Sequence, residues 1–311
     1  MPLLVLKIDV DTFRGTMEGV PNLVRLLRRH QAQASFLFSL GPDHTGWALR
    51  RAFRPGFFSK VSRTSVVEHY GLKTLAYGVL LPAPDIGKRC AAGMRAVQQA
   101  GFECGVHTWD HVVWQDQVRQ RNAPWTTAAM QRSWQRFSEI FGDAPHTHGA
   151  AGWQMNPHAF AALDAFGIDY ASDSREALAQ DGTLLRADAG PYRLECNGAP
   201  LRCIQMPTTL PTLDELLGRN IGGKMITTDT AADFLLDLTA TPRDHVYTLH
   251  AELEGQKLAP IFDKLLSGWR AQGYTLASMQ QQHQSLEAAQ LPVRALRWGE
   301  LPGRSGELVI A

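Results

Sequence analysis

The chain has few cysteines, no excess of charge and no long apolar run, and each shortage excludes a class of protein. Neither a disulfide framework nor a thiolate zinc site is expected, because the four cysteines form no CxxC or Cys/His spacing: Cys90, Cys104, Cys196 and Cys203. The 31 basic and 30 acidic residues leave a formal net charge of +1, so no nucleic-acid partner is expected. No stretch approaches the roughly 18 apolar residues of a spanning helix, and no signal peptide is recognisable. We therefore expect a cytoplasmic protein.

Strand-like and helix-like segments alternate along most of the chain. Apolar runs typical of buried strands lie at residues 3–8, 34–40, 102–106, 169–172, 201–206, 245–250 and 274–276. Helical periodicity lies between them at 20–30, 87–100, 126–141, 157–166, 231–238 and 260–271. This alternation predicts an α/β fold with a parallel sheet, and the number of units favours a barrel over an open sheet. We expect one barrel domain over 1–280, an insertion at 41–85 near the barrel mouth, and a tail at 281–311 packed on the outside.

Two carboxylates stand at the end of the first apolar run, in "LKIDVDTFRGT". Asp9 and Asp11 are two residues apart, so on a strand their side chains share a face. Two like charges held side by side are costly unless a positive group lies next to them. The pair therefore predicts a nearby cation.

A histidine pair in "GVHTWDH" follows a later strand. His107 and His111 are four residues apart, so in a helical turn both imidazoles lie on one face. Two histidines and one carboxylate leave coordination positions open, which is typical of a catalytic metal site. One divalent ion is expected, and zinc, manganese, cobalt, nickel and iron all suit these donors. Taken alone the histidine pair is more often surface or core decoration, but both acids and both histidines end predicted parallel strands, where barrel active sites form.

The segment "VYTLHAELEG" adds His250 at the end of a further predicted strand. A hydrolytic site needs a base for the water and an acid for the leaving group. His250 is a candidate for the acid, and a satisfied core histidine is the alternative. Of the two carboxylates, one can bind the ion while the other takes the proton of the water.

These motifs together resemble the polysaccharide deacetylase superfamily (NodB-homology, carbohydrate esterase 4), and the resemblance spans residues 3 to about 280. It implies a distorted (β/α)7 barrel that removes acyl groups from sugars with a divalent metal. Position by position, Asp9 is similar to the catalytic base and Asp11 to a metal ligand. His107 and His111 are similar to the other two ligands, and His250 to the general acid.

Two stretches depart from the superfamily pattern. The segment that usually carries an arginine beside the base reads "HGAAGWQMN", where either His148 takes its place or the stretch is a tight glycine turn. Trp153 in this segment is a candidate for limiting the size of the acyl pocket. The usual aspartate-tryptophan segment reads "YASDSRE". Asp173 and Arg175 there either orient His250 and grip an anionic group, or are a helix cap and a solvated charge.

The same stretches together resemble one branch of the superfamily, whose enzymes remove a formyl group from a formamido sugar linked to undecaprenyl phosphate during lipid A modification. An anionic membrane surface is then a second expected partner, at the cytoplasmic face of the inner membrane. The segment 44–68 favours this, because basic and aromatic residues alternate in it: Trp47, Arg50, Arg51, Phe53, Arg54, Phe57, Phe58 and Lys60. An aromatic cap over the barrel is the alternative. The rival functions are deacetylation of another amino sugar and a non-catalytic lipid- or sugar-binding barrel.

Overall fold

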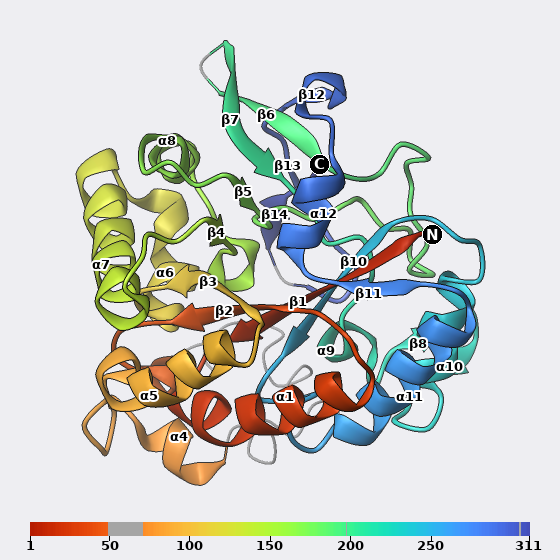
Figure 1. The fold of residues 1–311 in the computed structure, drawn as a ribbon, viewed down its shortest axis with the longest axis horizontal. Helices are drawn as coiled ribbons and strands as arrows, with labels where there is room; N and C mark the ends of the chain where they lie inside the picture. Colours follow the sequence, from red (N-terminus) through yellow and green to blue (C-terminus); the bar gives the residue numbers. More distant parts are fainter. Residues whose placement is uncertain (49–70, 197, 305) are drawn as a thin grey trace.

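The computed structural model describes residues 1–48, 71–196, 198–304 and 306–311. A ten-stranded sheet runs through the molecule in the order β10-β1-β2-β3-β4-β5-β7-β6-β12, with β11 also paired to β1 (Figure 1). From β10 to β7 the neighbouring strands are parallel, whereas β6 is antiparallel to β7. The expected α/β class and mostly parallel sheet are thus confirmed. Within the described ranges, no helix has both the length and the apolar character needed to cross a bilayer.

The elements follow the predicted alternation closely. The sheet strands are β1 Leu3–Val10, β2 Ser35–Ser39, β3 Glu103–Thr108, β4 Thr147–His148, β5 Tyr170–Ala171, β6 Tyr192–Cys196, β7 Ala199–Gln205, β10 His245–His250, β11 Thr275–Ala277 and β12 Val293–Ala295. The helices are α1 Val20–Arg29, α4 Leu72–Ala76, α5 Ile86–Gln99, α6 His111–Gln117, α7 Ala123–Phe141, α8 Pro157–Ala165, α9 Leu213–Leu216, α10 Ala231–Leu238, α11 Ala259–Ala271 and α12 Met279–Ser285.

The helices cover the sheet on its outer side. Helices α5 and α7 contact β3, α8 contacts β7 and α11 contacts β11 (Figure 1). Because parallel strands buried on both faces have no solvated side, β1 reads as an almost unbroken apolar run. The apolar helix faces meet the outward-facing residues of this strand in one large core.

The two faces of β1 differ in chemistry. Leu4, Leu6, Ile8 and Val10 belong to the large core beneath the helices, whereas Val5 belongs to a separate core inside the sheet. Side chains alternate along a strand, so the inner face continues from Val5 to positions 7 and 9. The inner face therefore changes from apolar to charged toward the carboxyl end of the strand.

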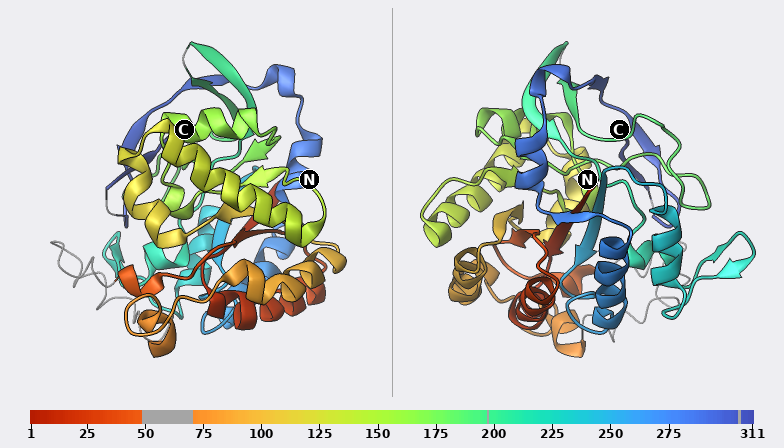
Figure 2. Two further views of the ribbon diagram at one scale, coloured as in Figure 1. Left: turned by 90° about the vertical axis from the view of Figure 1, so that its left-hand side faces the viewer. Right: turned by 45° about the vertical axis from the view of Figure 1, so that its right-hand side comes forward.

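The last thirty residues take part in the fold. Strand β12 pairs with β6 at the edge of the main sheet, and β13 (Trp298–Glu300) pairs with β14 (Glu307–Val309). Figure 2 shows this C-terminal part and the β6–β7 pair at the end of the molecule away from α1 and α5. A turn between β13 and β14 brings Arg304 to the buried carboxylate of Glu215. The tail thus reaches into the barrel as well as covering its outside.

Candidate active site

The candidate residues meet at the carboxyl ends of neighbouring parallel strands. Asp9 lies near the end of β1 and Asp11 directly follows it, while His107 lies in β3. His111 is the first residue of α6. His250 ends β10 and is in register with Asp9. Parallel α/β folds form their sites at this edge, because the strand-to-helix loops converge there.

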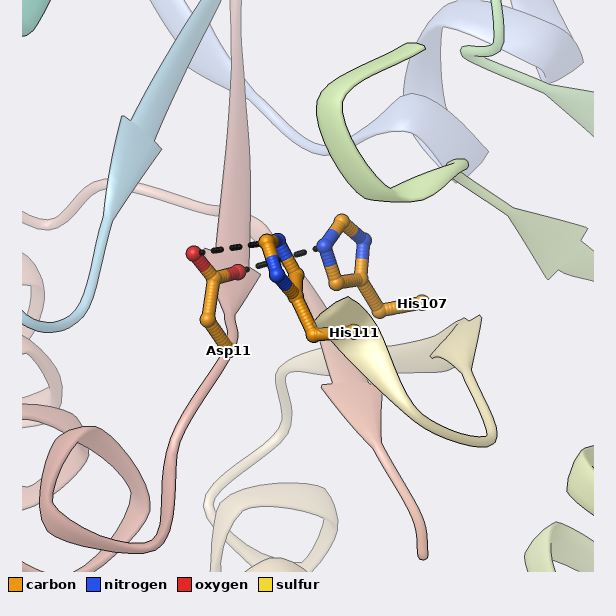
Figure 3. A group of neighbouring side chains, drawn as sticks. All are labelled: Asp11, His107 and His111. Atoms are coloured by element: carbon orange, nitrogen blue, oxygen red, sulfur yellow. Dashed lines mark ion pairs between the residues drawn. The ribbon is translucent and has the colours of Figure 1, made fainter. Parts of the chain in front are cut away.

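Asp11, His107 and His111 face one another (Figure 3). Nε2 of His107 is 3.2 Å from Oδ1 of Asp11, and Nε2 of His111 is 3.4 Å from Oδ2. One ligand atom from each residue lies within 4.8 Å of the other two. Although burial favours the neutral acid, positive charge on the imidazoles of His111 and His107 in their protonated form holds the pKa of Asp11 below its ordinary value.

The hydrogen bond behind His107 decides what this triad can hold. Nδ1 of His107 is 2.5 Å from the carbonyl oxygen of Gly149, which can only accept, so Nδ1 carries the proton. In the neutral ring, Nε2 then presents a lone pair toward Oδ1 of Asp11. Both atoms are buried without a hydrogen-bond partner. Two facing acceptors repel unless a cation lies between them, so the donor set fits a divalent ion.

Helix capping orients the second histidine. Asp110 caps α6 by accepting a hydrogen bond from the backbone N–H of Val113, at 3.1 Å. Its other carboxylate oxygen is 2.5 Å from Nδ1 of His44. Because His111 begins the helix that Asp110 caps, this carboxylate fixes the direction of the His111 side chain.

Asp9 has a neighbour that we did not predict. Nζ of Lys7 lies 3.2 Å from Oδ2 of Asp9, and both side chains are buried. Oδ1 of Asp9 is 3.8 Å from Nδ1 of His107 and has no hydrogen-bond partner. Lys7 is therefore a positive group next to the acid pair, and it is supplied by the same strand.

His250 is surrounded by carboxylates. Its backbone N–H donates to Oε2 of Glu254 at 2.9 Å, and its Nδ1 has no hydrogen-bond partner. Burial lowers the pKa of His250, but Asp214, Asp11 and other nearby carboxylates outweigh this effect and raise the pKa above its ordinary value. The raised pKa favours the protonated imidazole, which is the form that can donate a proton.

Glu252 supports the loop that carries Asp11. Its Oε1 accepts hydrogen bonds from the backbone N–H groups of Asp11 (3.1 Å) and Thr12 (2.8 Å) and from the Thr12 hydroxyl (2.8 Å). A Cβ on Gly15 would lie 1.9 Å from this oxygen, so only glycine leaves room for it. Burial and the Asp11 charge raise the pKa of Glu252 to about 8. We did not predict this role, although the "ELE" after His250 was a visible signal.

Two stretches of the sequence depart from the superfamily pattern. Their candidate residues lie together and have partners other than Asp9 and His250. Nδ1 of His148 is 2.8 Å from Oδ1 of Asp173, which also accepts from the backbone N–H of Ala150. Buried Arg175 forms an ion pair with Glu215.

Trp153 is almost fully buried and is contacted by three cations. Nζ of Lys7 lies 4.8 Å from its ring centroid, and the guanidinium carbons of Arg175 and Arg304 each lie at 4.5 Å. Arg304 was not predicted, because a contact from the far end of the chain leaves no local signal.

Among the expected membrane-interface residues, Trp47 is described. Its ring stacks on His44 at 3.9 Å between centroids, and its Nε1–H donates to the carbonyl oxygen of Gly78 at 2.7 Å. The other expected interface residues lie outside the described residues: Arg50, Arg51, Phe53, Arg54, Phe57, Phe58 and Lys60.

Comparison with known proteins identifies the family. A Shewanella sediminis protein named "Probable 4-deoxy-4-formamido-L-arabinose-phosphoundecaprenol deformylase ArnD" is 34% identical over 263 residues, which cover 84% of this chain and 79% of that protein. The chain belongs to the ArnD deformylase family. A Wigglesworthia glossinidia brevipalpis protein of the same name is 28% identical over 94% of this chain and 96% of its own. The chain is accordingly a hydrolase of the deformylase and deacetylase class, and the resemblance drawn from the motifs is confirmed.

The fold has a counterpart among solved structures. The crystal structure of a Mycobacterium smegmatis protein described as a polysaccharide deacetylase superposes with a TM-score of 0.60, covering 97% of this chain and 96% of that one. At 15% identity this likeness concerns the fold, and it confirms the barrel type expected from the motifs. No family model matches the chain.

Proposed function

We propose that this protein is a metal-dependent amidohydrolase that removes the N-formyl group of 4-deoxy-4-formamido-L-arabinose-phosphoundecaprenol. The products are formate and the free amino sugar lipid, which serves lipid A modification and polymyxin resistance. One observation carries the chemistry: Oδ1 of Asp11 and Nε2 of His107 lie 3.2 Å apart, and both atoms are buried without a hydrogen-bond partner. The names of the curated relatives support the substrate.

The proposed roles follow from the position of each group. Asp11, His107 and His111 would hold one divalent ion, which could be zinc, manganese, cobalt, nickel or iron. Such an ion supplies Lewis-acid polarisation of the formyl oxygen and lowers the pKa of water. The backbone hydrogen bond of His107 and the cap at Asp110 keep both imidazoles aimed at the ion before it binds.

Asp9 and His250 then divide the proton transfers. Oδ1 of Asp9, which has no hydrogen-bond partner, takes the proton of the water that attacks the formyl carbon. His250 gives its proton to the sugar nitrogen as the C–N bond breaks. Its raised pKa favours the protonated form, which is the state that this step requires. The two residues are register partners on adjacent parallel strands, so their side chains lie on the same side of the sheet and can act on one amide group.

A cavity next to the metal triad supports a lipid-linked substrate. It has a volume of about 320 Å³ and is lined by four indole side chains, those of Trp47, Trp109, Trp114 and Trp125. The chain between His107 and His111 forms one of its walls. An apolar chain attached to a sugar at the metal would therefore find an apolar surface within reach.

Several polar groups of this cavity are engaged elsewhere, although the Thr108 hydroxyl, which is buried without a hydrogen-bond partner, and Arg132 also line it. Nε1 of Trp114 donates to the carbonyl oxygen of Gln154 at 2.7 Å. His44 and Asp110 are paired with each other, and Nε1 of Trp47 donates to Gly78. Isoprene units that cover the indole faces give up no hydrogen bonds to water, so these faces suit an apolar chain.

We also propose that the protein binds the cytoplasmic surface of the inner membrane through the segment that contains Trp47. Sedimentation with anionic vesicles tests this, comparing the wild type with an Arg50→Glu/Arg51→Glu variant. Loss of binding in a variant that melts like the wild type supports the interface. Equal sedimentation of both proteins would contradict the membrane interface and favour the alternative, in which the segment is an aromatic cap over the barrel.

The reaction itself is tested by formate release from detergent-solubilised formamido-arabinose phosphoundecaprenol. Metal-free, metal-restored and His107→Ala proteins are compared. We expect formate from the metal-restored wild type and background from the other two, because His107 supplies one of three ligands. Acetate release from acetylated amino sugars, without formate, would make the protein a deacetylase. No release from either substrate would favour the non-catalytic barrel.

A further inference from the structure

Lys7 is a fully buried lysine in the middle of strand β1. Its side chain lies on the inner face of β1, two residues before Asp9. Nζ donates a hydrogen bond to Oδ2 of Asp9 at 3.2 Å, and no other acceptor for it is found among the described residues. The face of the Trp153 ring lies 4.8 Å from Nζ. The ammonium group is therefore enclosed between one carboxylate and one aromatic ring.

The space for Lys7 depends on a glycine that also orients a metal ligand. A Cβ on Gly149 would lie 2.7 Å from Cε and 3.2 Å from Nζ of Lys7. The carbonyl oxygen of the same residue accepts the Nδ1–H of His107. A larger side chain at Gly149 would displace Lys7 from Asp9 and disturb His107. The absence of a side chain at this position therefore serves both residues.

Stability alone does not account for a buried lysine at this position. Taking an ammonium group out of water costs free energy, and replacing a buried ion pair by apolar side chains of similar volume is often neutral or stabilising. The neighbouring inner-face residue, Val5, shows that the strand accommodates an apolar side chain on this face. A charge retained next to the catalytic centre indicates a role at that centre.

Other nearby cations are engaged with other acids. His148 is paired with Asp173, and Arg175 and Arg304 both pair with Glu215. Lys7 is thus the cation that contacts Asp9 in the described part of the chain.

We propose that Lys7 is the positioning residue of the catalytic base. By binding Oδ2 of Asp9 it fixes the carboxylate plane and leaves Oδ1 free, on the side of His107, as the oxygen that accepts the proton of water. The catalytic half of this proposal rests on the proposed function, whereas the pairing of Lys7 with Asp9 does not.

The test is a double-mutant cycle of Lys7→Met and Asp9→Asn, read in two ways. In formate release, Lys7→Met should lower kcat roughly 100-fold or more, within the usual range for loss of a general base, with KM and metal affinity unchanged. The double variant should be no slower than Asp9→Asn alone, because Lys7 acts only through Asp9. A near-normal kcat in Lys7→Met, or losses that multiply, would overturn the positioning role.

The second measurement is thermal unfolding, which needs no substrate. Lys7→Met leaves a buried carboxylate unpaired and should lower the melting temperature, and adding Asp9→Asn should recover most of the loss. Additive losses would mean that the two groups do not form a stabilising pair. Arg294→Met is the matched control, because it breaks the buried pair of Arg294 with Glu176 and should lower the melting temperature without changing kcat. If the wild type released no formate, the proposed function would fail while this cycle still reported on the pairing.

Discussion

Two pairs of buried carboxylates meet at this site, and their surroundings differ. Asp9 and Asp11 come from β1 and face a lysine and two imidazoles. Glu252 and Glu254 follow β10 and accept hydrogen bonds from backbone N–H groups and hydroxyls. The pKa of Asp11 lies below its ordinary value, whereas burial raises the pKa of Glu252 to about 8 and that of Glu254 to about 7. The neighbouring groups therefore distinguish the carboxylates proposed to react from the carboxylates that support the loop.

The largest effect is expected from the reactive pair. Asp11→Asn should abolish both metal binding and formate release, because it removes the anionic ligand. Asp9→Asn should retain the metal but lower kcat roughly 10²- to 10⁴-fold, the usual range for loss of a general base. Metal content after dialysis and initial rates measure the two effects separately. Near-normal turnover in Asp9→Asn would show that the base is another group.

The sequence was sufficient to predict most of the sheet and the grouping of Asp11, His107 and His111, for a physical reason. Buried parallel strands are nearly continuous apolar runs, and the polar residues that end them stand out. Lys7 was also predictable in principle, since it interrupts the apolar run of β1 and lies two residues before Asp9, on the same face of the strand. Arg304 was not, because its contact with Glu215 spans 89 residues and depends on the β13–β14 turn. Strands β12 to β14 lie in a polar stretch whose pattern resembles that of a loop.

A smaller effect is expected from the cap that orients His111. Asp110→Ala should destabilise α6 by about 1 kcal/mol and weaken metal binding roughly 10- to 100-fold, as for other residues that orient ligands. Asn122→Ala is the matched control, since Asn122 caps α7 by accepting from the backbone N–H of Trp125 at 3.2 Å. Calorimetric metal titration of both variants measures the difference. Equal metal affinity in the two variants would mean that the cap does not position His111.

The smallest effect on activity is expected from the supporting pair, whose change appears only as a dependence of stability on pH. Glu254 has a pKa of about 7 in the folded protein against 4.5 as its ordinary value, so between these values the unfolded chain releases a proton that the folded protein keeps. Stability should therefore fall as pH rises from 4.5 to 7, by up to about 1.4 kcal/mol per pH unit from this group.

Glu254→Gln keeps an acceptor for the N–H of His250 but cannot ionise. Its stability should equal that of the wild type near pH 4.5 and exceed it increasingly toward pH 7, with the difference levelling off at higher pH. Denaturant unfolding at several pH values measures this, and Glu300→Gln, at an exposed position, is the control that should follow the wild-type curve. If wild type and Glu254→Gln gave parallel curves, Glu254 would be ionised throughout. The contrast between reactive and supporting carboxylates would then rest on Glu252 alone.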